Sequence, residues 1–231
     1  MKAAMIKRYG SAEEIQIREG IKTPTIRENE VLIKTIASGI NAGDIEARKG
    51  HYKLLTPPGK KKGQTLLGIE FSGEIASVGS GVTNFKPGDE VFGSTHVFKG
   101  GKTNAEYASV PARYIALKPP GISHEEAASL PTGMLTSIRA FRDIAKLQKH
   151  QSVLINGASG AVGIYAIQLA RALGAKITAV ASSKNFEFIK SLGADEMLDY
   201  KEVDFTQLNE QFDVASTSSF NACKNILNNK G

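Results

Sequence analysis

The stretch QSVLINGASGAVGIYAIQLARALGAKITAVASSK, residues 151–184, decides the fold of this chain. A short, β-branched-rich run at 153–155 predicts a strand that is buried on both faces of a parallel sheet. Apolar residues then recur with helical spacing over 162–173, and Gly174 follows where a helix end would be capped. A second apolar run at 177–181 completes a unit of strand, glycine-rich turn, helix and strand.

The glycine-rich turn aligns with the G-x-G-x-x-G pattern of dinucleotide-binding proteins through Ala158, Gly160 and Gly163, with an extra Gly157 just before. The first glycine is therefore displaced. Gly160 lets the backbone approach a pyrophosphate, and Gly163 lets the helix pack on the strand. Backbone N–H groups at the helix start face the anion. The alternative is a tight turn alone, but the flanking strands and helix supply the context of a dinucleotide site.

The residues that end the second strand indicate which dinucleotide is bound. NAD-dependent enzymes place a carboxylate about 20 residues past the glycines, where it accepts hydrogen bonds from the ribose 2′-hydroxyl. Here that position falls on Ser183, between Ser182 and Lys184, and no acid comes before Glu187. Two hydroxyls and a cation suit the additional phosphate of NADP. We therefore predict NADP(H) as the cofactor, with a plain solvated turn as the alternative.

Composition narrows the class of protein. The 231 residues allow one large domain or two modest ones. No run of about 18 apolar residues predicts a membrane span, and the N-terminus lacks the apolar region of a signal peptide, so we expect a cytoplasmic protein with no membrane partner. The one cysteine, Cys223, excludes a disulfide framework or a cysteine-built metal site within one chain.

The net charge of +6 and the pI of about 9.3 raise the question of an acidic partner. The excess is spread along the chain, with one cluster at 60–62 that follows a proline- and glycine-rich stretch. No aromatic residues interleave with these lysines, so the cluster is typical of a solvated face and argues against nucleic-acid binding.

Residues 1–118 are predicted to form a β-rich domain, because short apolar segments recur there between glycine and proline turns. The expected strands are 31–36, 73–78, 90–92 and 107–110. A helix is expected over 41–49, ending at Gly50.

Residues 119–150 are predicted to form a helical connection, with one helix capped by Ser123 and a second over 135–147. Residues 151–231 are predicted to form the dinucleotide-binding domain, with further strands at 197–200 and 212–214. A βαβ unit needs about 30 residues. We therefore expect this parallel sheet to be incomplete at the C-terminus.

Four segments together resemble the medium-chain dehydrogenase/reductase superfamily: GINAGD (39–44), GIEFSGEIASVGSGVTNFKPGDEVFG (68–93), AEYASVPARYIALKPPGISHEEAASLP (105–131) and INGASGAVG (155–163). The sequence is most similar to the zinc-independent quinone oxidoreductase branch, the zeta-crystallin-like proteins. The resemblance implies an α/β fold: a GroES-like β-rich catalytic domain, then a Rossmann doubly wound parallel sheet, with the active site between them. It also implies a homodimer.

The resemblance allows the zinc-ligand positions of the family to be compared with this sequence one by one. Zinc-dependent members carry a ligand cysteine where this chain has Asn41 and a ligand histidine where it has Ile69. The four-cysteine loop of the structural zinc is also absent from this sequence. Glu70 alone does not hold the ion, because a zinc site needs three protein ligands. The histidines have no metal-ligand spacing to one another: His51, His96, His124 and His150. We therefore expect no metal.

Without a metal, the implied reaction is hydride delivery from NADPH to a quinone or an α,β-unsaturated carbonyl. These small-molecule acceptors are already electrophilic, so the protein supplies positioning and a hydrogen-bond donor. The resemblance assigns such roles to Tyr52, beside the nicotinamide, and to Asn41. Their alternatives are a tyrosine packed at a loop edge and a residue that only turns the loop. Asp44 is interpreted as a helix cap.

The resemblance also assigns the cofactor contacts. The pyrophosphate loop comprises Ser159, Gly160, Ala161, Val162 and Gly163, the 2′-phosphate pocket Ser182, Ser183 and Lys184, the adenosine side Tyr200 and the nicotinamide side Thr136. The alternative for Thr136 is a hydroxyl bonded to its own helix. An NADPH-binding protein with a structural or regulatory role is the competing function, because the same fold serves both.

Overall fold

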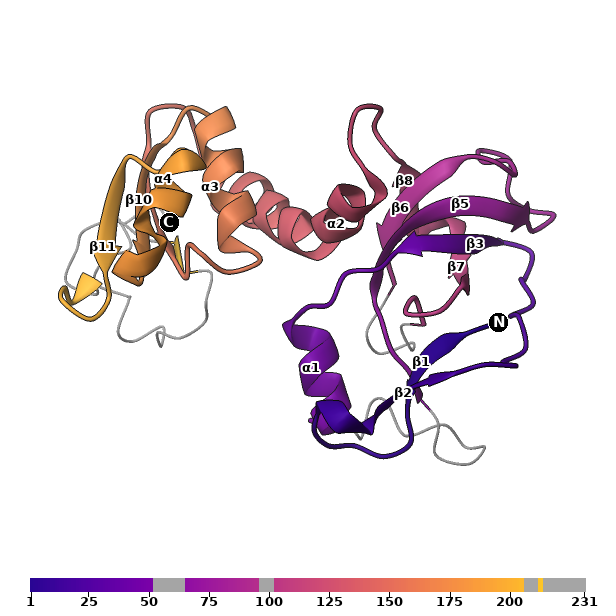
Figure 1. Ribbon diagram of the computed structural model, residues 1–231. Coiled ribbons are helices and arrows are strands. Elements are labelled where there is room, and N and C mark those ends of the chain that lie inside the picture. The colour runs from indigo at the N-terminus through magenta and orange to yellow at the C-terminus, as the bar shows by residue number, and fades with distance from the viewer. Residues whose placement is uncertain (52–64, 96–101, 206–211, 214–231) are drawn as a thin grey trace. The chain divides into compact units, whose positions relative to one another are not determined.

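The computed structural model describes residues 1–51, 65–95, 102–205 and 212–213 (Figure 1). The chain divides into two compact units, Met1–Pro131 and Thr132–Gly231. The division falls within helix α2 (His124–Ile138). The region 119–150, predicted as a helical connection, thus contributes residues to both units.

An antiparallel sheet of five strands in the order β7-β3-β5-β6-β8 forms the centre of the first unit. The strands are β3 (Glu30–Ala37), β5 (Glu70–Val78), β6 (Glu90–Ser94), β7 (Tyr107–Pro111) and β8 (Ile115–Leu117). The four strands expected from the sequence are confirmed, and β8 is added. The sheet buries an apolar cluster of Val31, Ile33, Phe71, Ile75, Val91, Ala108 and Val110.

A smaller antiparallel sheet in the first unit has the order β2-β1-β4. Its strands are β1 (Ala3–Ile6), β2 (Ile15–Arg18) and β4 (Thr65–Leu66), and a short 3-10 helix, η1 (Ala12–Glu14), precedes β2. The sequence did not predict these strands. Every residue of β2 is exposed, so the strand lacks the apolar alternation of a half-buried strand.

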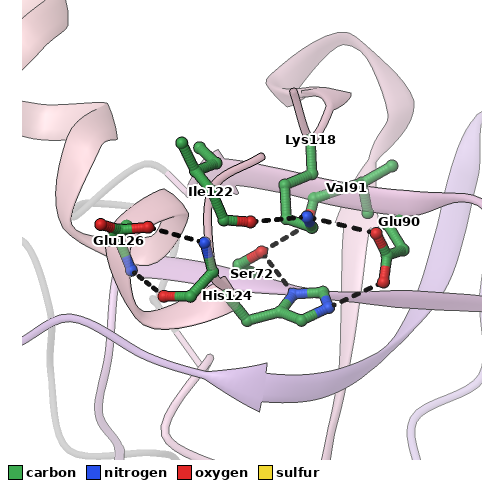
Figure 2. A network of polar contacts seen from close by, with 8 residues as sticks. Ser72, Glu90, Val91, Lys118, Ile122, His124 and Glu126 are labelled. Carbon is green, nitrogen blue, oxygen red and sulfur yellow. Dashed lines mark hydrogen bonds and ion pairs between the residues drawn. The ribbon is translucent and has the colours of Figure 1, made fainter. Parts of the chain in front are cut away.

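Helix α2 begins with a capping box and a histidine contact to the sheet. Ser123 Oγ accepts the Glu126 N–H at 3.1 Å, and Glu126 Oε2 accepts the Ser123 N–H at 2.7 Å, as the sequence predicted. Figure 2 shows His124 beside Ser72, with 2.8 Å between Nδ1 and Oγ. The Ser72 hydroxyl donates its one hydrogen to the Val91 carbonyl at 3.0 Å.

Glu90 on β6 connects His124 to Lys118, which directly follows β8 (Figure 2). His124, Ser72, Glu90 and Lys118 form one polar cluster. Its Oε2 lies 3.2 Å from Lys118 Nζ, and its Oε1 lies 3.2 Å from His124 Nε2. Lys118 Nζ also donates to the Ile122 carbonyl at 2.8 Å. Hydrogen bonds from Lys118 and then His124 hold the pKa of Glu90 below its usual range. The cluster therefore ties the start of α2 to two strands.

The second unit contains a parallel sheet of four strands in the order β11-β10-β9-β12. Its strands are β9 (Ser152–Asn156), β10 (Lys176–Ala181), β11 (Glu196–Asp199) and β12 (Phe212–Asp213). Its helices are α3 (Gly163–Ala172), α4 (Phe186–Ser191) and the 3-10 turn η5 (Ser183–Asn185). The strands predicted at 153–155, 177–181, 197–200 and 212–214 and the helix predicted over 162–173 are confirmed, and the strand order is that of half a doubly wound sheet.

The prediction of a separate helix over 135–147 is wrong. α2 continues without a break to Ile138, and a π-helical segment, η4 (Arg139–Ile144), follows it directly. Pro131 and Gly133 both lie inside α2. A Cβ at Gly133 would collide with the Tyr165 ring and the Ala161 carbonyl, so close packing within the second unit explains this glycine.

Gly163 brings α3 directly onto the turn that follows β9. A Cβ at Gly163 would collide with the Gly157 carbonyl oxygen and lie 2.7 Å from the Ala158 carbonyl carbon. Both obstacles are backbone, so neither yields by rotating a side chain. At Gly160 the nearest atom would be the Gly157 oxygen at 3.2 Å.

We expect Gly163→Ala to destabilise the protein by about 1–3 kcal/mol, the usual range for an overpacked site. Gly160→Ala should destabilise it less, because its added methyl group meets one atom at near-contact distance. Urea denaturation of both variants measures the difference. Equal free energies of unfolding for the two variants would contradict the close-packing argument.

We expect Glu90→Gln to lower the free energy of unfolding at pH 7 and to have little effect near pH 3. The folded-state pKa of Glu90 is depressed, so its stabilising contribution is present above the pKa of the unfolded chain and is lost as pH falls through the folded value. Urea denaturation across this pH range measures the change. Glu28→Gln, at an exposed acid, is the control. An effect of Glu90→Gln that does not vary with pH would exclude the ionic contribution.

Candidate functional site

The glycine-rich turn of the second unit is anchored at both ends. It leaves β9 through Gly157, whose φ of 70° lies in the left-handed region that favours glycine. The Ala158 N–H then donates to the Val180 carbonyl on β10 at 3.0 Å, and the Gly160 N–H donates to the Gly157 carbonyl at 2.9 Å. The predicted pyrophosphate loop thus forms a compact turn in which Gly160 and Ala161 are exposed and Gly163 is buried.

Helix α2 also contacts this turn, through Ser137. Ser137 is fully buried, and its hydroxyl lies 2.9 Å from the Gly133 carbonyl and 3.3 Å from the Val162 carbonyl. Its neighbour Thr136, the predicted nicotinamide-side residue, is exposed. Ser137 was not predicted. The one sign of it in the sequence is a small polar residue among apolar helix positions.

The turn after β10 lies beside the glycine-rich turn. Asn185 Nδ2 donates to Ser159 Oγ at 3.0 Å, which connects the two loops. Between them Ser182 is half-buried, whereas Ser183 and Lys184 are exposed. The structure therefore brings together the predicted pyrophosphate loop and the predicted 2′-phosphate pocket. Asn185, which makes the connection, was not predicted.

Asp199 ends β11, directly beside the end of β10, because it pairs with Ala181 in the parallel register. The Asp199 side chain is buried, and its oxygens accept the N–H groups of Ser183 and Lys201, each at 2.9 Å. These hydrogen bonds, from Lys201 first and then Ser183, lower the pKa of Asp199. Tyr200, the predicted adenosine-side residue, follows it and is 53 % exposed.

In the first unit, Asn41 caps helix α1 (Ala42–Lys49). Its Oδ1 accepts the Gly43 N–H at 2.9 Å, and its backbone N–H donates to Asp44 Oδ2 at 3.1 Å. The helix ends at Gly50, with φ of 88°. The predicted helix, its glycine end and the capping role of Asp44 are confirmed.

The amide of Asn41 also contacts a buried acid. Its Nδ2 donates to Glu70 Oε2 at 2.8 Å, and Glu70 is only 4 % exposed. Asp44 is buried close by, and burial, aided by the charge of Glu70, raises the pKa of Asp44 against the hydrogen bonds it accepts. A Cβ at Gly39 would lie 3.0 Å from Glu70 Oε2, so the 39–44 loop packs closely on this carboxylate.

The two positions that hold zinc ligands in zinc-dependent members are occupied here by Asn41 and Ile69. Ile69 is buried and apolar, and the part of the chain that the structure describes contains no group of three or more His, Cys, Asp or Glu residues placed to hold a metal. Tyr52 and His96 lie outside the described residues. Within those residues, no helix has the length and apolar character needed to cross a membrane.

Comparison with known families covers both units. Residues 27–139 match the model of the alcohol dehydrogenase GroES-like domain, and residues 161–229 match that of the zinc-binding dehydrogenase. Together these models match most of the chain. They correspond to the GroES-like domain and the Rossmann domain that the sequence motifs implied.

Relatives and solved structures agree with this assignment. A 2-methylene-furan-3-one reductase of Solanum lycopersicum is 36% identical over 225 residues, which cover 94% of this chain and 57% of the relative. The quinone oxidoreductase of Coxiella burnetii is similar in structure with a TM-score of 0.81 and 35% identity, covering 89% of this chain and 64% of that one. The Escherichia coli quinone oxidoreductase complexed with NADPH has a TM-score of 0.79 and 28% identity, over 90% and 61% of the two chains.

This chain thus spans between 57% and 64% of the length of these proteins. The match to the Solanum lycopersicum reductase includes the 39–44 loop and the glycine-rich turn, and the family models cover both domain types. The chain belongs to the medium-chain dehydrogenase/reductase superfamily, in its quinone oxidoreductase branch.

Proposed function

We propose that the protein is an NADPH-dependent reductase that transfers hydride to a quinone or an α,β-unsaturated carbonyl compound. The observation that carries the proposal is the pair of adjacent loops in the second unit, the glycine-rich turn and the turn over 182–184, connected by the Asn185–Ser159 hydrogen bond. The names of the relatives, a furanone reductase and quinone oxidoreductases, supply the acceptor class.

The preference for NADPH follows from the charges around the turn after β10. Ser182 and Lys184 offer a hydroxyl and a cation, the groups that bind a phosphate monoester. The nearest carboxylate, Asp199, directs its oxygens to backbone N–H groups. It is therefore satisfied without a ribose hydroxyl. The solved relative with bound NADPH supports the same cofactor.

Bound NADPH supplies the hydride, and the chain supplies orientation and hydrogen bonds. Gly160 lets the backbone approach the pyrophosphate. Gly163 lets α3 begin directly at the turn, so that its first backbone N–H groups face the anion. Asn41 keeps one Nδ2 hydrogen beyond the one it donates to Glu70, and this hydrogen is available to the acceptor oxygen or the cofactor amide. Thr136 and Tyr52 are proposed to act on the nicotinamide side.

We propose that the reaction needs no zinc. Asn41 is an amide donor to Glu70 at a position where a metal site requires a thiolate, and Ile69 offers no lone pair. Glu70 is thus engaged by an amide within a loop that the α1 cap holds in place. Quinones and enones accept hydride without a Lewis acid, which is consistent with this donor set. A homodimer is proposed from the family resemblance.

Steady-state oxidation of NADPH and NADH with a panel of quinones and enones tests the function. We expect turnover with at least one acceptor class and a preference for NADPH of about tenfold or more, equivalent to about 1.4 kcal/mol. A simple alcohol with NADP⁺ is the negative control. A preference for NADH would contradict the proposed cofactor, and tight NADPH binding without turnover would favour the structural or regulatory role.

Metal analysis tests the zinc proposal separately. We expect far less than one zinc per chain in purified protein and no loss of NADPH oxidation after treatment with a chelator. A zinc-dependent alcohol dehydrogenase treated in parallel shows that the chelator works. Stoichiometric zinc that is required for turnover would overturn the proposal.

A further inference from the structure

Asp199 connects the two chain segments that leave the parallel sheet at the proposed phosphate pocket. The side chain is 6 % exposed. One oxygen accepts the Ser183 N–H after β10, and the other accepts the Lys201 N–H after β11, each at 2.9 Å. The same carboxylate therefore holds a segment on each side, eighteen positions apart in sequence (201 − 183 = 18).

The backbone of Asp199 holds the second segment as well. Its carbonyl oxygen accepts the N–H groups of Glu202 and Val203, both at 3.0 Å. A turn therefore begins at Asp199 and carries Tyr200, whose ring is largely exposed. Ser183, predicted for the 2′-phosphate pocket, and Tyr200, predicted for the adenosine side, are thus held by one residue that was not predicted.

The hydrogen bonds of Asp199 also resolve an electrostatic conflict. A carboxylate near a phosphate pocket repels the ligand, and hydrogen-bond donors that point at the carboxylate weaken this repulsion. Backbone N–H groups from Lys201 and Ser183 point at Asp199 and stabilise its ionised form, as its lowered pKa indicates. Its oxygens are directed into the protein, whereas Ser183 and Lys184 remain exposed.

The Ser183 N–H is committed to Asp199, so this backbone group is not a donor to a ligand. The Ser183 side chain also hydrogen-bonds to Asp199. That leaves the Ser182 hydroxyl and the Lys184 ammonium as the phosphate donors of the turn. Both lie next to the residue that Asp199 holds. The geometry of these donors therefore depends on the carboxylate.

We propose that Asp199 is a positioning residue for the 2′-phosphate of NADPH: it fixes the 182–184 turn and the Tyr200 turn together, and so sets the preference for NADPH over NADH. The inference rests on the proposed function, because it names the residue behind the cofactor choice of that same site. Asp199 acts through the two turns and does not itself touch the cofactor.

Nucleotide titration without any acceptor tests the inference. In Asp199→Asn the shape is kept, but one side-chain oxygen becomes an NH₂ group that faces a backbone N–H. We expect the Kd of NADPH to rise about tenfold, and the Kd of NADH, which lacks the phosphate, to change less than about twofold. Lys184→Ala, which removes a proposed direct contact, should shift the same ratio.

Asp195→Asn is the matched control. Asp195 Oδ2 accepts the Ile177 N–H at 2.7 Å, so it too is a carboxylate bonded to a backbone N–H, but at the start of β10 and not after its end. We expect its NADPH/NADH affinity ratio to equal that of the wild type. Thermal unfolding of all variants shows how much each loses in stability.

Three results would count against the inference, and they are distinguishable. An unchanged affinity ratio in Asp199→Asn, or a parallel loss for both nucleotides, would overturn the positioning role while leaving the proposed function intact. The same shift in Asp195→Asn would show that any backbone-bonded carboxylate of this sheet has the effect. Wild-type protein that binds neither nucleotide would overturn the proposed function and the inference with it.

Discussion

The close approach of α3 to the turn after β9 is the constraint on which the second unit depends. It requires a residue without a Cβ at Gly163, because the Gly157 and Ala158 backbone occupies the space that a side chain would fill. Once the helix starts there, its first N–H groups lie beside the turn, and the turn is held to β10 through the Ala158 N–H. The candidate phosphate site is therefore a consequence of helix packing as much as of the loop itself.

The sequence predicted the elements whose signals are local. Strands β3, β5, β9 and β10 have apolar runs bounded by turn residues, and their burial follows from that pattern. β2 and β8 were not predictable in this way: β2 is exposed throughout, and β8 has three residues. The start of the helix predicted over 135–147 was wrong because its apolar spacing continues that of α2, which runs on to Ile138.

The same distinction applies to the candidate site: residues with local signals could be predicted, and residues with distant partners could not. The glycines and the Ser182–Lys184 turn could be predicted, because their chemistry is contained in a few consecutive residues. Asn185, Ser137 and Asp199 could not, since each has its partner on a different element: Asn185 contacts Ser159 across 26 positions, and Ser137 contacts Val162 across 25. Only the fold makes them neighbours.

The 39–44 loop of the first unit has a thermodynamic consequence. Burial and the nearby Glu70 raise the folded-state pKa of Asp44, so between the unfolded and folded values the native chain binds more protons than the unfolded chain. Stability from this residue therefore falls as pH rises through that interval. Above this interval the ionised Asp44 carboxylate stays buried near Glu70, at a cost that its hydrogen bonds from the Asn41 and Gly68 backbone only partly offset. The loop that is proposed to contact the substrate thus keeps its conformation at a cost in stability, which is common at sites under functional selection.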